Sequence, residues 1–390
     1  MKWWVVQRPH NRPRGTIMKS TKSTVALLPP SNERTRYGIV CAILASVVAM
    51  AAVLFASVTR AGPDQENTEL APSIKPAVDG VLDLFKQRPV VALGDLHWLA
   101  QEESFYSALV RDPRFADSVG NVVVEFGGEV SQGIIDRYVA GENVPLTELR
   151  KVWTETAGWV PGPTSLGYVN FFVNVRAANL KLPPEHRIKV WLGEPKINWS
   201  QVKSWQDLQS YFPLRDGNYF RIISEDILKK RQKTLLIIGT GHLFGPEGPG
   251  PVKAKIDAAY PNKLVVVSPF VGYVEAECNA RIAAQTKDWP VPSVVGPVEG
   301  TRLKSQLQLP NCDNFQDQRD MWANSEAILY LGAPDSLTVS PMDPNIYLDF
   351  DYFNEENRRL RCCTPNEPMD WDKLLHSGTS PVPNKFNTRN

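Results

Sequence analysis

The chain has 390 residues, of which 22% are charged, and its formal net charge is +1. There is no global basic excess that would indicate a nucleic-acid partner, and no acidic tail that would indicate a scaffold or chaperone. The one strong asymmetry of charge is local and lies at the N-terminus.

Residues 1–36 carry eight Lys or Arg and a single acid, Glu33, and are followed by the uncharged stretch 37–59. That stretch is long enough to cross a bilayer core of about 30 Å as a helix. A cleavable signal peptide is the alternative, but its apolar core is usually only ~7–15 residues long, and no clear Ala-x-Ala site follows here. A start at Met18 would shorten the basic segment and keep the apolar run. We therefore expect a basic cytoplasmic segment (1–36), a transmembrane anchor (37–59) and, by the positive-inside tendency, an extracytoplasmic C-terminal part.

The rest of the chain is interpreted as a linker (60–76), one domain (77–361) and a flexible tail (362–390). In chain order the pattern predicts a strand over 88–94, a helix over 100–112, a strand over 120–126, helices over 130–140, 145–155 and 167–181, a strand over 188–193, a helix over 216–231, strands over 234–239, 263–268 and 327–331, and a helix over 352–361. Strands that alternate with helices indicate βαβ units. We therefore expect a three-layer α/β/α fold with a mostly parallel central sheet.

The chain has five cysteines, of which Cys41 lies in the expected anchor. In an oxidising compartment the other four could pair in any of three ways. A Cys278–Cys312 bridge would close the least regular region of the domain. A bond between the adjacent Cys362 and Cys363 is not expected, because it would strain the peptide between them. The spacing lacks the paired Cys-x-x-Cys units of a structural zinc site.

Four of the apolar runs end in an acid or a histidine, at the point where each strand should end. Runs of this kind, bounded by glycine, are typical of strands buried on both faces. Open α/β sheets bind ligands just past the carboxyl ends of their strands. If the four strands are neighbours, they bring together Asp95, His97, Glu125, Glu194 and His242. We expect His97, Glu125 and His242 around one cavity, with Asp95 and Glu194 at its rim.

Two of these runs share the pattern Gly-x-x-His, as Gly94-Asp-Leu-His97 and Gly239-Thr-Gly-His242. Glycine permits a sharp exit from a strand, so the histidine can turn back over the strand end. There is no Walker loop, no Gly-x-Gly-x-x-Gly after a strand and no Gly-x-Ser-x-Gly elbow. Nucleotide-dependent and serine-hydrolase mechanisms are therefore disfavoured.

The two Gly-x-x-His motifs, the strand-end Glu125 and the acids Glu102 and Glu103 resemble those of the superfamily of erythromycin esterases, ChaN-type haem-uptake lipoproteins and Tiki/TraB proteases. The resemblance covers roughly residues 85–270. It is strongest to a bacterial, membrane-anchored branch with Gly-Asp-x-His near the start and Gly-x-Gly-His-Leu later. The resemblance implies a three-layer α/β fold with the site at the strand ends. The esterase branch usually has Gly-Glu-x-x-His or Gly-Glu-x-His-Gly, whereas this chain has Asp95 and then His97-Trp98.

Each candidate residue also has a purely structural interpretation. His97 and His242 could each satisfy a loop carbonyl, and Asp95 could cap the following helix. Glu125 could pair with Arg137 or another nearby base, since a buried carboxylate needs a partner. Glu194, which precedes a proline, could be a solvated turn acid. Glu102 and Glu103 lie in the first turn of a helix, where acids offset the helix dipole, and a structural role is favoured for both.

Three functional hypotheses follow. The first is a membrane-anchored hydrolase, in which His97 or His242 acts as general base, or both join Glu125 in holding Zn, Mn or Fe; its substrate would be a small molecule or a peptide. The second is a cell-surface protein that binds haem or another iron ligand. The third is a non-catalytic member of the fold.

Overall fold

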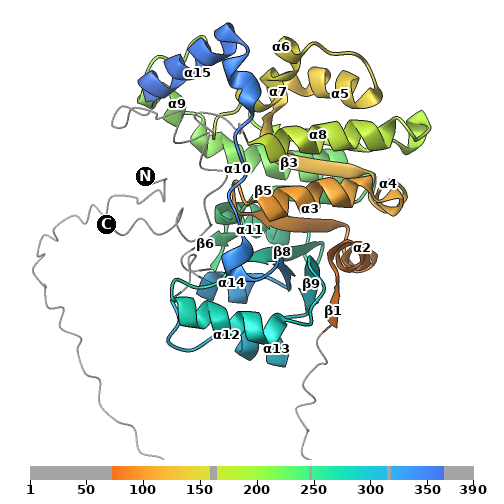
Figure 1. Cartoon of the computed structure of the whole chain (residues 1–390). Helices are drawn as coiled ribbons and strands as arrows, with labels where there is room; N and C mark the ends of the chain where they lie inside the picture. Colours follow the sequence, from red (N-terminus) through yellow and green to blue (C-terminus); the bar gives the residue numbers. More distant parts are fainter. Residues whose placement is uncertain (1–72, 159–164, 246–247, 314–317, 364–390) are drawn as a thin grey trace, which may run out of the picture. The chain divides into compact units, whose positions relative to one another are not determined.

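A computed structural model describes residues 73–158, 165–245, 248–313 and 318–363 (Figure 1). The expected basic segment and anchor, residues 1–59, lie outside the described residues, as do residues 364–390 of the expected tail. Among the described helices, none is long and apolar enough to cross a bilayer.

The described residues form a central eight-stranded sheet in the order β1-β9-β10-β8-β2-β5-β3-β4. Neighbouring strands from β10 to β4 are parallel, whereas β9 is antiparallel to both β10 and β1. The expectation of a mostly parallel sheet in an α/β fold is confirmed, but the antiparallel edge was not foreseen. The strands are β1 (Ser73–Pro76), β2 (Val90–Asp95), β3 (Asn121–Gly128), β4 (Lys189–Glu194), β5 (Thr234–Gly239), β8 (Leu264–Phe270), β9 (Ser293–Gly296) and β10 (Ala327–Tyr330), with a small separate hairpin of β6 (Phe244–Gly245) and β7 (Gly248–Pro249).

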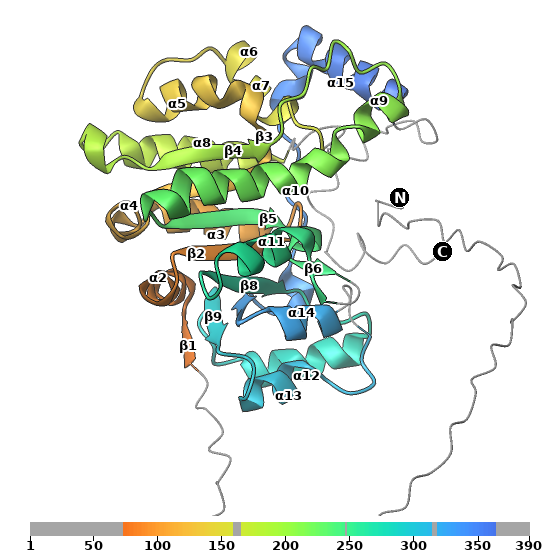
Figure 2. The same cartoon turned by 180° about the vertical axis from the view of Figure 1, so that it is seen from behind.

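Helices cover both faces of the sheet: α3 and α8 lie in front of it in Figure 1, and α10 and α11 lie behind it, as the reverse view in Figure 2 shows. The helices are α2 (Ala77–Gln87), α3 (Ala100–Arg111), α4 (Pro113–Ser118), α5 (Gln132–Ala140), α6 (Leu146–Leu149), α7 (Lys151–Thr154), α8 (Leu166–Asn179), α9 (Trp205–Gln209), α10 (Phe212–Arg221), α11 (Pro251–Ala259), α12 (Ala276–Thr286), α13 (Arg302–Leu307), α14 (Gln318–Asn324) and α15 (Phe350–Cys363).

The central strands are apolar along their whole length because each face packs against a helical layer. In β2, Val91 and Leu93 belong to the core beneath α3 and α8, whereas Val90 and Ala92 belong to the core beneath α10 and α11. Successive side chains of a strand point to opposite faces, so a strand between two layers must be apolar at every position. This burial fixes the strands and leaves their ends for polar groups.

Several boundaries differ from those expected. Strand β1 lies within the expected linker, and α15 continues to Cys363, into the expected tail. The expected helix over 145–155 is two short helices, α6 and α7. The expected helix over 216–231 begins earlier, at Phe212, and continues as a π-helical turn over Ile222–Ile227.

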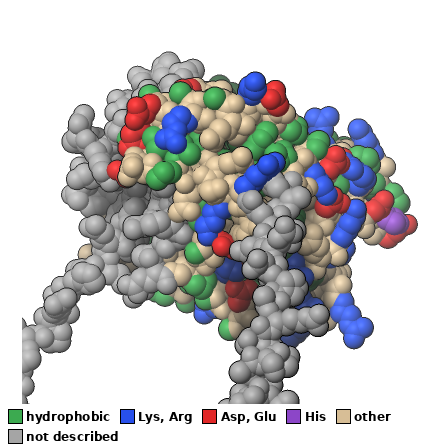
Figure 3. Space-filling view, turned by 90° about the horizontal axis from the view of Figure 1, so that it is seen from below, with side chains coloured by type: hydrophobic (Ala, Val, Ile, Leu, Met, Phe, Trp, Pro, Cys, Tyr) green, Lys and Arg blue, Asp and Glu red, His purple; other side chains and the backbone are tan. Residues whose placement is uncertain are grey.

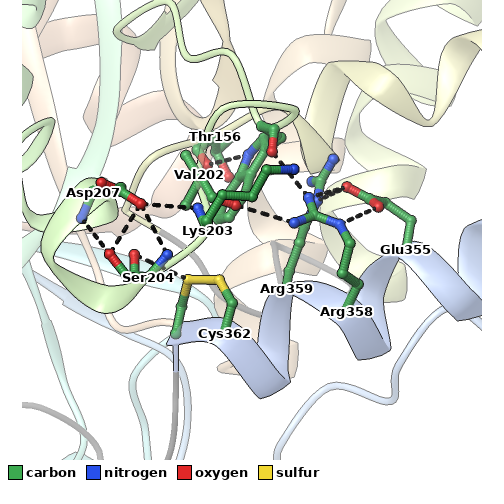
Figure 4. The surroundings of a disulfide bond; sticks show 11 residues. Thr156, Val202, Lys203, Ser204, Asp207, Glu355, Arg358, Arg359 and Cys362 are labelled. Atoms are coloured by element: carbon green, nitrogen blue, oxygen red, sulfur yellow. Dashed lines mark hydrogen bonds and ion pairs between the residues drawn. A yellow bond between two sulfur atoms is a disulfide. The ribbon is translucent and has the colours of Figure 1, made fainter.

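Two disulfides are present among the described residues. One joins Cys278 to Cys312, a pairing that the sequence left open among others. The other joins the adjacent Cys362 and Cys363, contrary to expectation (Figure 4). The sequence argument considered only the peptide between these two cysteines, whereas the fold buries Cys363 at the end of α15 in a small apolar cluster with Trp199.

Candidate functional site

The four strands that end in titratable groups are neighbours, in the order β2, β5, β3 and β4. Because they are parallel, their carboxyl ends lie at the same edge of the sheet. The register aligns Asp95 at the end of β2 with Gly239 at the end of β5, and Val124 of β3 with Ile237 of β5. The residues at these ends can therefore meet, although they are up to 147 positions apart, as His242 and Asp95 are.

His97 and Asp95 form a hydrogen-bonded pair just past β2. The Nδ1 atom of His97 lies 2.7 Å from Oδ2 of Asp95, and Asp95 also accepts hydrogen bonds from the hydroxyls of Tyr106 (2.8 Å) and Tyr168 (2.5 Å). The Asp95 side chain is 1% exposed and that of His97 is 36% exposed. Asp95 is therefore buried beneath His97, not at the rim as expected. A carboxylate held in this way can fix the tautomer and orientation of an accessible imidazole.

Glu125 lies between the two histidines and is 2% exposed. Its Oε1 atom lies 2.5 Å from Nη2 of Arg215 and 3.4 Å from Nε2 of His242, and its Oε2 accepts a hydrogen bond of 2.5 Å from the Gly239 N–H. Burial by itself would raise the pKa of Glu125. The positive charges of His242 and Arg215 outweigh this effect and hold the pKa well below its ordinary value. Glu125 is therefore a buried carboxylate at neutral pH.

His242 follows β5 in a single helical turn, Thr240–His242, which carries its ring back over the strand end. Its Nδ1 atom lies 2.5 Å from Oδ1 of Asp216, and its ring meets that of Tyr219 edge-on at 5.3 Å between centroids. Burial would lower the pKa of His242, but the neighbouring Glu125 and Asp216 raise it to about 9. His242 is therefore an imidazolium at neutral pH.

Glu194 anchors the guanidinium of Arg215 beneath the site. Its Oε1 atom lies 2.6 Å from Nε of Arg215 and accepts a hydrogen bond from the Tyr219 hydroxyl. Its Oε2 atom accepts hydrogen bonds from the N–H groups of Ala157 (3.0 Å) and Gly158 (2.8 Å). The side chain is fully buried, so Glu194 is neither a solvated turn acid nor a rim residue. It holds Arg215, which in turn contacts Glu125.

Gly239 has no side chain, and this allows His97 and Glu125 to approach the end of β5 closely. A Cβ atom at this position would lie 2.8 Å from Cε1 of His97 and 3.0 Å from Oε2 of Glu125. The backbone of Gly239 has a φ of −51°, which any residue can adopt. The glycine is therefore required for close packing and not for a special backbone conformation, which corrects the reason inferred from the sequence.

Three residues of α10 were missed by the sequence analysis: Arg215, Asp216 and Tyr219. The base considered for Glu125 was Arg137, which instead pairs on the surface with Glu142 and Glu148. One signal was available. A helix that follows a parallel strand begins near the carboxyl edge of the sheet, so the first turns of α10, after β4, lie beside the strand ends.

Glu102 and Glu103 support the loops around the site. Glu102 accepts a hydrogen bond of 3.0 Å from the Leu96 N–H, and its pKa is raised well above the ordinary value by burial and by the charge of Asp95. Glu103 accepts a hydrogen bond of 2.6 Å from the Ser165 hydroxyl. Glu102 thus fixes the residue that follows Asp95, and Glu103 fixes the start of α8, which carries Tyr168.

The described residues contain no group of three or more His, Cys, Asp or Glu side chains arranged to hold a metal ion. The contacts of the expected ligands give the physical reason. Glu125 is engaged by Arg215 and the Gly239 N–H, and the Nδ1 atoms of His97 and His242 are each directed at an aspartate. Arg215 supplies the buried positive charge that a metal would otherwise bring. The expectation of Zn, Mn or Fe held by His97, Glu125 and His242 is therefore not met.

Comparison of the sequence with protein-family models gives no match, and comparison with curated proteins gives none either. Among solved structures, the chain is similar to a protein from Bacillus cereus, with 9% identity and a TM-score of 0.42 over 68% of this chain and 93% of that one. It is also similar to the type III effector HopBA1, with 11% identity and a TM-score of 0.33 over 51% and 87% of the two chains.

ChaN of Campylobacter jejuni, whose structure is described as binding haem cofacially, is a third match, with 13% identity and a TM-score of 0.29 over 50% of this chain and 87% of that one. A ChaN protein is thus among the solved structures that the chain resembles, and ChaN is one of the proteins whose motifs the sequence resembles. A likeness at these levels says nothing of activity.

Proposed function

We propose that the protein is a hydrolase that activates water at the strand ends with His97, Glu125 and His242, and without a bound metal. One observation carries the proposal: two imidazoles, each paired with its own aspartate, lie on either side of a buried glutamate. When two titratable groups lie in different environments, their pKa values differ, and one site can then supply both a base and an acid.

His97 is the candidate general base. Asp95 lies at hydrogen-bond distance from its Nδ1 atom and orients the ring, and an imidazole oriented by a carboxylate can act as a general base. The ring is more than one third exposed, so water and substrate can reach it. In the proposed step, the oxygen of a water molecule attacks the electrophilic carbon of the substrate while His97 takes one proton of that water.

His242 is the candidate acid. Because its pKa is about 9, it carries a proton at neutral pH that it can donate to the leaving group, and its charge stabilises the negative charge that develops on the substrate oxygen. Glu125 and Asp216 hold the imidazolium in place and are not consumed. After the leaving group departs, proton transfer from His97 to His242 through solvent restores the starting state.

The location of the enzyme stays a proposal based on the sequence. The basic residues before the apolar run 37–59 support a single-pass protein anchored in the membrane, with the hydrolase domain outside the cytoplasm. Its substrate would be a small molecule or a peptide that reaches that compartment.

The test is hydrolysis of chromogenic acyl esters, a lactone series and peptide nitroanilides by the purified protein. We expect at least one class to be turned over, with kcat lowered by about 100-fold or more in His97→Ala and His242→Gln and unchanged by EDTA. His186→Ala, which changes an exposed histidine paired with Asp117, is the matched control. Full activity in His97→Ala, or a loss with EDTA that added metal reverses, would contradict the proposed mechanism.

Haem binding is the second candidate, and the exposure of the His97 ring is the observation that favours it. An axial ligand must be accessible to the haem, and the exposed His97 ring is held by a carboxylate, as metal-binding imidazoles commonly are. Titration with haemin decides between the two functions: a Soret shift that is lost in His97→Ala supports haem binding, and an unshifted band in both proteins removes that candidate.

A further inference from the structure

A cleft with a volume of about 520 Å³ lies beside α15, and neither His97 nor His242 lines it. Its walls come from three parts of the chain: α7 with the residues that follow it, the segment after β4, and α15 itself. They include Lys151, Glu155, Trp199, Lys203, Tyr352 and Glu356. A cleft of this size is in the range of sites for small ligands.

Glu356 is a buried acid of this cleft that has no hydrogen bond. It is 1% exposed, and neither of its carboxyl oxygens has a hydrogen-bond partner among the described residues. The nearest cation is Nη1 of Arg359, at 3.6 Å. The guanidinium of Arg359 already donates to the Thr154 carbonyl, Glu155 and Glu355. Burial raises the pKa of Glu356 to about 8 despite Arg359, which agrees with a carboxyl that lacks a donor.

The cleft also has two lysines without an acidic partner. Lys151 and Lys203 are exposed, and neither ammonium forms an ion pair with any of the described residues. Figure 4 shows the side chain of Lys203 extending toward the guanidinium groups of Arg358 and Arg359. Both arginines are already paired with Glu355. The lysines therefore leave positive charge in the cleft that no carboxylate of the described chain neutralises.

We propose that this cleft binds a small zwitterion, such as a free amino acid or a short peptide, whose ammonium group donates to Glu356 and whose acidic group lies between Lys151 and Lys203. A neutral ligand would leave the charge of the two lysines without a counter-charge, and a simple anion would leave Glu356 without a donor. A ligand with an ammonium and an acidic group supplies partners to all three side chains.

One segment of the chain, residues 154–158, connects the cleft to the candidate active site. Thr154 and Glu155 line it and are held by Arg359, while Ala157 and Gly158, a few residues further on, donate to Glu194 beneath Arg215. A bound zwitterion would therefore tighten the segment that positions Glu194. It should also shift the imidazole resonances of His242, even though it does not touch that ring.

The test is calorimetric titration of the full chain with L-alanyl-L-alanine, its N-acetyl form and its C-terminal amide. We expect the free dipeptide to bind and each blocked form to bind at least tenfold more weakly. Glu356→Gln should weaken binding of the free dipeptide at least tenfold, as should the double variant Lys151→Ala/Lys203→Ala. The matched controls are the exposed Glu277→Gln and Lys255→Ala, which should bind like the parent.

O-phosphoethanolamine carries the same two charges and distinguishes a headgroup source from a peptide source. Tighter binding of this probe than of the dipeptide, with the same loss in Glu356→Gln, supports the site and assigns it to phosphorylated amines. No binding of either probe, equal binding of the N-acetyl dipeptide, or undiminished binding to Glu356→Gln in a folded protein would overturn the proposal. Because these measurements need no turnover, they stand or fall independently of the proposed hydrolase.

Discussion

Replacement of His242 by glutamine should change how the stability of the protein depends on pH. Against the effect of burial, Glu125 and Asp216 raise the pKa of His242 from 6.5 to about 9. A group whose pKa is higher in the folded protein stabilises it fully below the unfolded pKa, and this stabilisation is lost as the pH rises through the folded pKa. One pKa unit corresponds to about 1.4 kcal/mol, so the imidazolium contributes about 3 kcal/mol to the free energy of unfolding at pH 6. The side chain is 15% exposed, so solvent screening lowers this figure only slightly.

Urea unfolding of the parent and of His242→Gln at pH 6 and pH 10 measures this contribution. We compare the free energy of unfolding of the parent with that of the variant at each pH. The difference between the two proteins should be about 3 kcal/mol larger at pH 6 than at pH 10. The comparison is a difference between two proteins, so the titration of groups that do not interact with His242, such as Glu356, cancels. His186→Gln, in which an exposed histidine is replaced, should follow the parent at both values.

The result that would refute the reasoning is a constant difference between parent and variant across this range. The two acids would then not stabilise the imidazolium, and His242 would have no basis as a proton donor. A stabilising His242 also means that loss of this histidine should weaken the fold. Loss of His97 should weaken the fold less, because its ring is the more exposed of the two.

Three further predictions concern packing, buried charge and topology. Gly239→Ala should lower the free energy of unfolding by about 1–3 kcal/mol, because the added Cβ meets His97 and Glu125. Gly241→Ala, with nothing within 4 Å, should be neutral, and equal melting temperatures for the two variants would contradict the close approach. Arg215→Met should lower the free energy of unfolding by about 3–5 kcal/mol, because it leaves Glu125 and Glu194 without their buried cation. In the same denaturation assay, the control Arg137→Met, at an exposed residue, should lower it by about 1 kcal/mol or less. Protease added to intact cells should digest the domain from Gly94 onward, and its full protection would reverse the proposed orientation.

The sequence predicted the central strands well, because burial on both faces leaves a local record. Strand β5 spans the expected residues, Thr234–Gly239, and β2, β3 and β4 differ from expectation by one or two residues at each end. An uninterrupted apolar run of this length cannot be a surface strand, and the glycine at its end marks where the chain leaves the sheet. The titratable group at each strand end could be recognised for the same reason.

The short edge strands left no such record. Strands β1 and β9 have four residues each, and their antiparallel pairing joins positions more than two hundred residues apart. Nothing in a run of four residues distinguishes a strand from a linker, so β1 was assigned to the linker. The sequence also did not predict the bond between Cys362 and Cys363, because this bond depends on how the end of α15 packs against the rest of the domain.

What the sequence determined by itself was which strands are buried and that five of its titratable residues, Asp95, His97, Glu125, Glu194 and His242, follow them. Only the tertiary structure decided that these strands are neighbours and which residues lie beneath the histidines. The base that Glu125 requires comes from α10, ninety residues further along the chain, and no local pattern connects the two. A buried carboxylate must have a compensating partner, but the identity of that partner depends on the packing of helix on sheet. The order of β2, β5, β3 and β4 thus turned four separate strand ends into one site.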